Sequence, residues 1–131
     1  MCYWADKMNN LIQRKKKSDE RGWLIELFKG SECDNKIEGQ VYSFSVKPGK
    51  VRGNHFHKRK TEWFVVIKGK VVLRLDNEEK SNEITLSGEE PRIVQVLPRV
   101  KHTFSNPFEE EAVVIAFIDE EFNEKDPDTF Y

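Results

Sequence analysis

The strongest constraint on the fold is a succession of short apolar segments separated by turn-forming residues. Seven such segments follow one another from Gly22 onward, each bounded by Gly, Pro, Asn or acidic residues; they span residues 22–29, 40–47, 61–67, 71–76, 82–87, 92–97 and 111–117. Short strands at regular spacing are typical of an all-β sandwich or barrel. Helical signals are thin, and no repeat, low-complexity stretch or interdomain linker is visible, so we expect a single all-β domain.

Two features of these segments predict how they pack. The segment 40–47 alternates, which places Tyr42, Phe44 and Val46 on one face of a strand. The segments 61–67 and 71–76 are separated by little more than a central glycine, Gly69, a spacing that indicates a β-hairpin. We therefore expect these two segments to pair with each other.

The charge balance excludes several classes of function. Lys plus Arg number 22 and Asp plus Glu number 23, which gives a formal net charge of −1, whereas a nucleic-acid-binding domain shows a clear basic excess. No apolar run approaches the ~20 residues of a membrane span, and the N-terminal residues lack the apolar centre of a signal peptide. We expect a cytoplasmic protein without nucleic-acid or membrane partners.

The glycines and cysteines exclude further classes. None of the seven glycines belongs to a G-x-G-x-x-G or P-loop pattern, so we expect no NAD cofactor and no ATP-driven step. Cys2 and Cys33 have neither a disulfide framework nor zinc-ligand spacing, and we expect both to be reduced.

The three histidines of the chain occupy positions from which they can converge. On a strand, the two-residue spacing of His55 and His57 puts both rings on the same face. A turn at residues 58–60 would bring Glu62 beside them on the adjacent strand, and His102 lies on a later segment. Three imidazoles and one carboxylate suit a divalent first-row metal and leave positions open for water or substrate.

Each of these residues also has a simpler interpretation, as a structural histidine or a solvated carboxylate. Without a metal, one of the histidines, such as His55 or His57, is the natural general base, because its pKa lies near the working pH. The roles of ligand and base exclude each other at any one ring, since a nitrogen bound to a metal cannot also take a proton.

The spacing of these residues resembles a known motif. The first cupin motif is matched at every interval by Gly49, His55, His57, Glu62 and Gly69. The second cupin motif is matched more loosely, with Val100 in place of a usual glycine, by Gly88, Pro98, His102 and Asn106. The resemblance implies a single jelly-roll cupin barrel over residues 19–118. An N-terminal arm at 1–18 would precede it, and a tail at 119–131 would pack on it.

Longer stretches narrow the resemblance to nucleotide-sugar enzymes. Residues 19–28, DERGWLIELF, resemble the opening strand of dTDP-4-dehydrorhamnose 3,5-epimerases and dTDP-sugar 3,4-ketoisomerases. Residues 47–70 and the tail 122–131 are more similar to the C-terminal cupin domain of bifunctional capsular-polysaccharide enzymes. Those enzymes make precursors of UDP-N-acetyl-L-fucosamine. The resemblance runs from residue 19 to 130 and does not include the reductase half of the bifunctional enzymes.

The resemblance implies an isomerase in the biosynthesis of a surface polysaccharide, such as capsule or lipopolysaccharide. Its substrate would be a dTDP- or UDP-linked 4-keto-6-deoxy sugar, and it would act as a C3 epimerase or a 3,4-ketoisomerase by abstracting a proton next to the ketone. The resemblance also favours a bound metal, which could be Zn, Fe, Mn or Ni. Two alternatives are a metal-dependent cupin dioxygenase and a non-catalytic sugar-binding cupin.

Residues outside the metal set are candidates for proton transfer and substrate binding. Tyr42 is a candidate proton donor, although its strand face also suits a core aromatic. Arg52, Lys58 and Arg59 flank the histidine pair, where they form either a diphosphate site or a solvated basic loop. Arg21 is a further candidate for the nucleotide end of the substrate, through the family resemblance alone.

We also expect a homodimer. Small antiparallel barrels leave strand edges open, and an open edge is a template for another chain. The apolar segment 22–28 could pair with its copy across a two-fold axis.

Overall fold

The computed structural model describes residues 13–33 and 38–131. Cys2, the side chain of Cys33 and most of the expected N-terminal arm lie outside what it describes. Within these ranges the strands are β1 (Lys17–Asp19), β2 (Gly22–Lys29), β3 (Gln40–Val46), β4 (Val51–His55), β5 (Glu62–Lys68), β6 (Lys70–Asp76), β7 (Ser81–Ser87), β8 (Ile93–Val96), β9 (Lys101–Ser105) and β10 (Ala112–Ile118). A single 3₁₀ turn, Gly30–Cys33, follows β2 in the described part of the chain.

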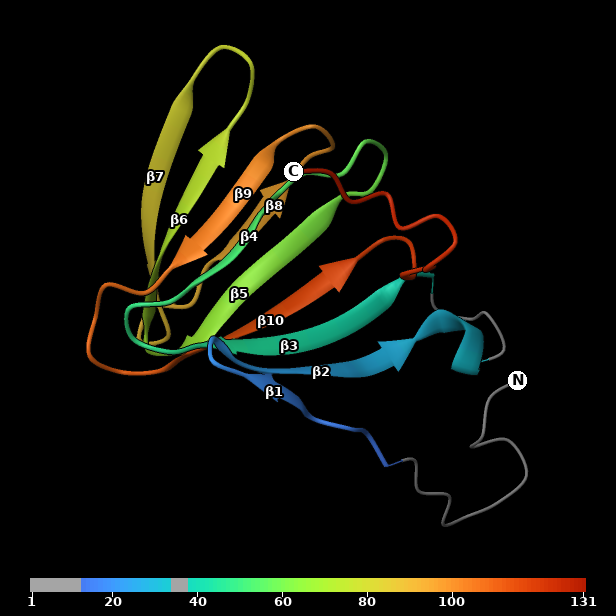
Figure 1. Ribbon diagram of the computed structural model, residues 1–131, viewed down its shortest axis with the longest axis horizontal. Helices are drawn as coiled ribbons and strands as arrows, with labels where there is room; N and C mark the ends of the chain where they lie inside the picture. Colours follow the sequence, from blue (N-terminus) through green and yellow to red (C-terminus); the bar gives the residue numbers. More distant parts are fainter. Residues whose placement is uncertain (1–12, 34–37) are drawn as a thin grey trace.

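The described strands form two antiparallel sheets, so the all-β prediction is confirmed. Six strands pair in the order β1-β2-β3-β10-β5-β8, and four pair in the order β4-β9-β6-β7. The two sheets face each other (Figure 1). No helix in the described ranges is long and apolar enough to cross a membrane.

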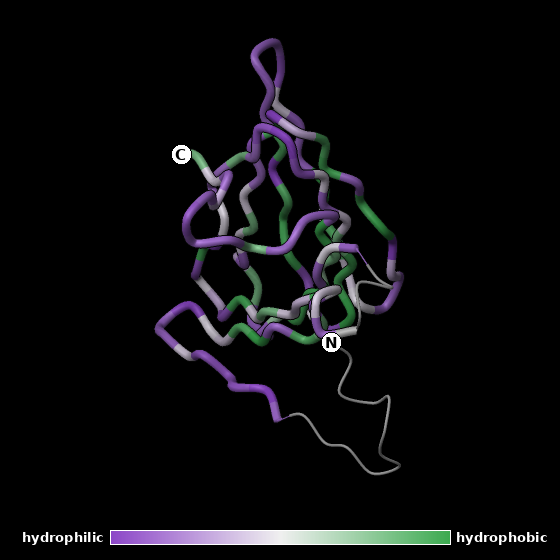
Figure 2. Tube along the Cα trace, turned by 90° about the vertical axis from the view of Figure 1, so that its right-hand side faces the viewer, coloured by the Kyte–Doolittle hydropathy of each residue, from purple (hydrophilic) through white to green (hydrophobic). Residues whose placement is uncertain are grey.

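The core lies between the two sheets. Phe44 of β3, Phe64 of β5 and Phe104 of β9 pack edge to face, with ring centroids 4.8 to 6.4 Å apart, a favourable geometry for aromatic rings. Val46 is fully buried and Tyr42 packs against this core, as the alternation of β3 predicts. Figure 2 shows apolar residues along the strands and hydrophilic residues in most of the loops.

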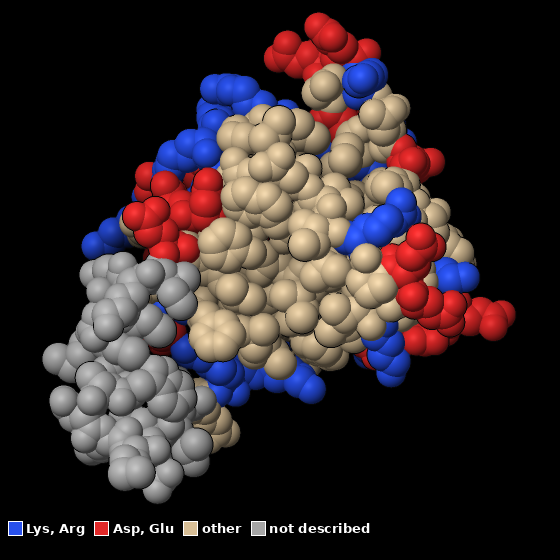
Figure 3. All heavy atoms as spheres, turned by 180° about the vertical axis from the view of Figure 1, so that it is seen from behind, with Lys and Arg blue, Asp and Glu red and all other residues tan. Residues whose placement is uncertain are grey.

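The outer face of the six-stranded sheet is also apolar. On β5 and β10 the side chains that alternate with core residues are Trp63, Val65, Ile67, Val113, Ile115 and Phe117. Ile93 of the edge strand β8 is 73% exposed. Figure 3 shows the molecule from behind, where a broad area without charged side chains is bordered by acidic and basic residues.

The predicted hairpin around Gly69 is wrong. Strand β5 pairs with β10 and β8, whereas β6 pairs with β7 and β9 in the other sheet. Both edges of β5 are therefore already paired. Gly69 instead turns the chain from one sheet to the other with a φ of 73°, and a Cβ on it would lie 2.9 Å from backbone atoms of Glu111 and Ala112.

Strands β1, β4 and β9 are not among the seven apolar segments. The strand considered for the pair His55 and His57 is β4, but it ends at His55. Strands β4 and β9 have the sequences VRGNH and KHTFS, which contain little apolar alternation. They form because backbone hydrogen bonds to neighbouring strands stabilise them, since β9 lies between β4 and β6. After β10 the tail returns to the barrel, and Figure 1 shows it beside the loop between β4 and β5. There Phe130 pairs with Phe56.

Candidate metal centre and active-site pocket

Four side chains that the sequence singled out converge at one end of the barrel. His55 ends β4 and stands opposite His102 of β9 in the strand register. His57 lies two residues beyond β4, and Glu62 is the first residue of β5. The expectation that Glu62 lies on the strand adjacent to His55 is wrong, since β4 and β5 belong to different sheets and Glu62 approaches the histidines from the opposite one.

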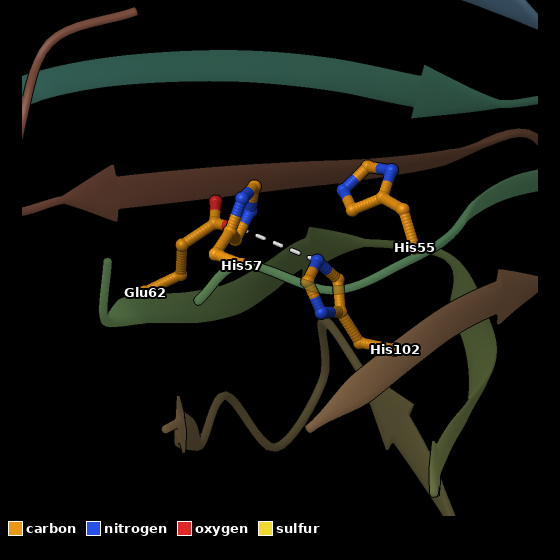
Figure 4. Close-up of side chains that lie close together, drawn as sticks. All are labelled: His55, His57, Glu62 and His102. Atoms are coloured by element: carbon orange, nitrogen blue, oxygen red, sulfur yellow. Dashed lines mark hydrogen bonds and ion pairs between the residues drawn. The ribbon is translucent and has the colours of Figure 1, made fainter. Parts of the chain in front are cut away.

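The three rings and the carboxylate surround a common point (Figure 4). One donor atom from each residue lies within 4.8 Å of all the others. The ring centroids of His55, His57 and His102 are 4.7 to 5.5 Å apart. Glu62 Oε1 is 2.6 Å from His57 Nε2 and 3.3 Å from His102 Nε2. The four donor atoms are therefore close enough together to bind one small ion.

A buried nitrogen without a partner supports this interpretation. The Nε2 atom of His102 makes no hydrogen bond to any described residue, and its 3.3 Å contact with Glu62 lacks hydrogen-bond geometry. Such orphaned polar atoms are rare in protein interiors. Imidazole and carboxylate donors suit Zn, Fe, Mn and Ni, so the residues present fit a divalent metal.

The protonation states also suit a metal. Burial would raise the pKa of the Glu62 carboxyl, but its contacts with His102, His57 and Tyr42 hold that pKa at about 2. Burial, with smaller contributions from His102 and His57, lowers the pKa of His55 to about 4. At neutral pH the site therefore contains a carboxylate and a neutral His55 ring, which are the metal-binding forms.

His57 behaves differently because both of its ring nitrogens have partners. Burial would lower its pKa, but the bond to Glu62 and a bond to the backbone carbonyl of Asp128 raise it overall. The Nδ1 atom is 2.6 Å from that carbonyl oxygen. The orientation of this ring is therefore fixed from both sides.

Tyr42 joins the core to this cluster. Its hydroxyl donates to Glu62 Oε2 at 2.5 Å, while its ring stacks on Phe44 with the centroids 6.0 Å apart. Burial and the neighbouring Glu62 carboxylate raise the pKa of Tyr42 well above 10. The phenol therefore keeps its proton at neutral pH, which suits a proton donor and not a base.

Two adjoining cavities open beside the cluster, and both are lined by Leu24, Tyr42 and His55. The first, of about 240 Å³, also contacts His57 and Glu62. The second, of about 300 Å³, is lined by polar and apolar residues that include Arg21, Phe44, Arg52, His102 and Tyr131. A molecule with a polar end and a smaller reacting end could occupy both.

The four predicted substrate-binding cations divide into two groups. Arg52 is buried, donates to the backbone carbonyls of Ser45 and Trp23, and makes no ion pair with a described carboxylate. Arg21 lines the same cavity and pairs with Asp19.

Lys58 and Arg59 do not line either cavity. The Nζ of Lys58 lies 4.1 Å from the centroid of the Phe130 ring. Arg59 pairs with Glu120 and Asp126 of the tail. The structure therefore brings Arg21 and Arg52 to the candidate site and directs the other two cations to the tail.

The cavity residues that sequence reasoning missed include Lys60 and Tyr131. Lys60 is only 3% exposed, lines the first cavity and donates to the Pro127 carbonyl at 3.2 Å. Tyr131 lines the second cavity, with its ring centroid 6.1 Å from that of His55. Lys60 belongs to a run of three basic residues, which normally indicates a solvated loop. Nothing in the sequence shows which of these three side chains turns inward.

Known proteins resemble this chain in sequence and in fold. A curated relative from Pseudomonas aeruginosa, named UDP-2-acetamido-2,6-beta-L-arabino-hexul-4-ose reductase, is 35% identical over 115 residues, which make up 86% of this chain and 30% of the relative. A relative from Aneurinibacillus thermoaerophilus, named TDP-4-oxo-6-deoxy-alpha-D-glucose-3,4-oxoisomerase, is 29% identical over 119 residues, 90% of this chain and 84% of that protein.

The solved structure of the capsular polysaccharide assembling protein CapF from Staphylococcus aureus superposes with a TM-score of 0.83 at 29% identity. The match covers 92% of this chain and 32% of CapF, so the chain spans about a third of that protein's length. The predicted cupin barrel is confirmed. A family model described as the polysaccharide biosynthesis C-terminal domain matches residues 17–130. With this match over most of its length, the chain belongs to the polysaccharide biosynthesis C-terminal domain family.

Proposed function

We propose that the protein is an isomerase of a nucleotide-activated 4-keto-6-deoxy sugar in surface polysaccharide biosynthesis. It would act as a C3 epimerase or a 3,4-ketoisomerase. The observation that carries the proposal is the His and Glu cluster beside two cavities that also contain a phenol and two arginines. The names of the two curated relatives support the substrate class, since both contain a keto sugar linked to a nucleotide.

The proposed metal ligands are His55, His57, Glu62 and His102. A divalent ion held there would act as a Lewis acid on the sugar carbonyl and acidify the neighbouring C–H bond. Glu62 would bring a negative charge to the ion, while His102 would contribute a nitrogen that makes no hydrogen bond to a described residue.

Proton transfer is assigned to two residues that line both cavities. Tyr42 would return a proton to the sugar, because its phenol remains protonated at neutral pH. His55 would be the base in the metal-free alternative, since its ring is neutral and accessible from both cavities. In that alternative His57 would be less available as a base, because Glu62 and Asp128 already bind its nitrogens.

The diphosphate of the substrate is assigned to Arg52 and Arg21. Arg52 is buried, and it donates to two backbone carbonyls but has no ion pair with a described carboxylate, so an approaching anion would balance its charge. Both arginines line the second cavity, which is continuous with the reacting end at His55. Lys58 and Arg59 would act only on a part of the nucleotide that extends toward the tail.

Deuterium exchange tests the proposal. The metal-loaded protein is incubated in deuterated water with dTDP- and UDP-linked 4-keto-6-deoxy sugars, and proton NMR follows the C3 hydrogen. We expect loss of the C3 proton signal and formation of either the C3 epimer or the 3-keto isomer. Lys80→Ala serves as a control, because it removes an exposed cation in the loop between β6 and β7 that lines neither cavity, and its exchange rate should equal that of the wild type.

Other outcomes of this experiment favour the alternatives. Saturable binding of the nucleotide sugars without exchange at C3 would identify a non-catalytic sugar-binding cupin. Turnover that requires oxygen would identify a metal-dependent dioxygenase, whereas activity under anaerobic conditions excludes it.

We also propose that the protein is a homodimer. The outer edge of β2, where the sequence suggested pairing, is partly occupied by β1. The apolar outer face of the six-stranded sheet offers a second surface for a copy of the chain, because it has few charges to desolvate.

A further inference from the structure

One acidic side chain of the tail is buried although its neighbours are not. Residues 122–127 are exposed, whereas Asp128 is only 4% exposed. Its backbone has a φ of 50°, in the left-handed region that Asp and Asn tolerate better than most residues. A charged side chain is buried in this way only where it is paired or hydrogen-bonded.

The carboxylate of Asp128 is bound by three consecutive backbone amides. Lys58 N donates to Oδ1 at 3.0 Å, Arg59 N donates to Oδ2 at 3.1 Å, and Lys60 N donates to Oδ2 at 3.2 Å. These amides belong to the loop that immediately follows His57. A carboxylate that accepts several backbone N–H bonds fixes the conformation of such a loop.

The backbone of the same residue contacts the metal-ligand set. The Asp128 carbonyl oxygen is 2.6 Å from His57 Nδ1, and the other nitrogen of this ring, Nε2, is 2.6 Å from Glu62 Oε1. Two backbone bonds between Phe56 and Phe130, of 2.9 and 3.0 Å, align the tail with this segment. The side chain of Asp128 thus holds the loop, and its backbone carbonyl holds the His57 ring.

We infer that Asp128 is a positioning residue, which holds Nδ1–H of His57 on its carbonyl and thereby directs Nε2 into the candidate metal centre. A histidine that donates one N–H to a carbonyl has a fixed ring orientation, and such partners of metal ligands contribute strongly to metal affinity. The inference rests on the proposed function only in treating His57 as a ligand. The Nδ1 bond itself does not depend on a metal.

The test compares Asp128→Asn with Asp126→Asn. Asparagine keeps the side-chain size and tolerates the left-handed backbone, but it removes the charge and replaces one acceptor oxygen with a donor. Asp126 is a matched control in the same tail, because it is exposed and pairs with Arg59. The first measurement is the affinity for Co²⁺, determined by competition with a chelator. We expect Asp128→Asn to weaken binding by about 10- to 100-fold and Asp126→Asn to leave it unchanged.

The second measurement is independent of the metal. In the metal-free protein, nitrogen-edited NMR should show a slowly exchanging Nδ1–H of His57 in the wild type and in Asp126→Asn. Its exchange should be faster in Asp128→Asn, because the side chain that holds the residue-128 carbonyl against the ring has lost part of its bonds to the loop. A purely structural role would lower the unfolding free energy of Asp128→Asn while Co²⁺ affinity and the His57 resonance stay as in the wild type. That result would overturn the inference.

Failure of the metal proposal is distinguishable from failure of this one. If wild-type protein binds no Co²⁺ at the cluster, the metal assignment is wrong, but the His57 resonance still decides whether Asp128 holds the ring. If Asp128→Asn does not fold, the exchange rate of the His57 Nδ1–H in the wild type tests the inference. A protected Nδ1–H supports the inference and a rapidly exchanging one contradicts it.

Discussion

At the scale of single residues, the cluster of three histidines and Glu62 makes a direct prediction about metal content. His55→Ala and His102→Ala should each lower the metal-to-protein ratio, because each removes a nitrogen donor. Glu62→Gln should lower it less, since glutamine keeps an oxygen donor. The measurement is elemental analysis of protein purified without chelator, with Lys58→Ala as the control. An unchanged ratio in the double variant His55→Ala/His102→Ala would place the metal elsewhere.

Tyr42 carries the second prediction at this scale. Tyr42→Phe keeps the ring that stacks on Phe44 and removes only the hydroxyl that donates to Glu62. If Tyr42 returns the proton, deuterium exchange at C3 should persist while the product rate falls by roughly a hundredfold to ten-thousandfold. A product rate within about twofold of the wild type, far short of that range, would make Tyr42 a core aromatic alone.

The sequence predicted the members of the candidate metal cluster but not Asp128, which contacts it. His55, His57, Glu62 and His102 were found because their spacing matches a motif and their side chains are metal ligands. Asp128 could not be found this way, because its carboxylate accepts from backbone amides and its own backbone carbonyl binds the His57 ring, and such contacts leave no pattern in the sequence.

At the scale of elements, strands with a clear apolar alternation were predicted and strands stabilised by their neighbours were not. The burial pattern of β10 alternates strictly, and its sequence AVVIAFI is apolar throughout. β4 and β9, which carry His55 and His102, are polar and short. The hairpin error has the same origin, because the sequence around Gly69 indicates a turn without specifying which sheet the next strand joins.

Gly69 carries the prediction at this scale, with Gly49 as its matched control. Both have positive φ, of 73° and 79°, but a Cβ at Gly69 would lie 2.9 Å from backbone atoms, whereas nothing lies within 4 Å of one at Gly49. Gly49→Ala should cost about 1–2 kcal/mol of unfolding free energy through backbone strain alone. Gly69→Ala should cost about 1–3 kcal/mol more through the steric contact. Urea denaturation measures both, and equal losses would contradict the close approach at the corner.

At the scale of the whole molecule, the buried histidines make stability depend on pH. The pKa of His55 is about 4 in the folded metal-free protein against an ordinary value of 6.5. Between these values the unfolded chain binds more protons, so stability should rise with pH across this window. The raised pKa of His57 acts in the opposite direction above pH 6.5. Unfolding free energies of wild type and His55→Gln between pH 4 and 8 test this, and the variant should show a shallower rise at the acidic end.

The outer face of the six-stranded sheet carries the last prediction, which concerns assembly. The apolar side chains of this face lie on β10, β5 and β8. Three strands at a spacing of ~4.8 Å and a length of ~20 Å give a face on the order of 300 Å². A patch of this size matches the largest apolar patch of a typical monomer, which is often functional. Two such faces would bury roughly 600 Å², less than the ~1,200 Å² of stable specific interfaces, so the dimer should be weak and reversible.

Ile115→Lys places a charge at the centre of this face on β10, and Val72→Lys places one on the outer side of β6 in the other sheet, where both wild-type residues are half-buried. Sedimentation velocity at micromolar concentration should show dimers for the wild type and Val72→Lys, and monomers for Ile115→Lys. The charge acts through desolvation, since it would have to leave water when the two faces meet. A monomeric wild type would contradict the homodimer. A dimeric Ile115→Lys with unchanged stability would show that the interface lies on another surface, such as the edge of β2.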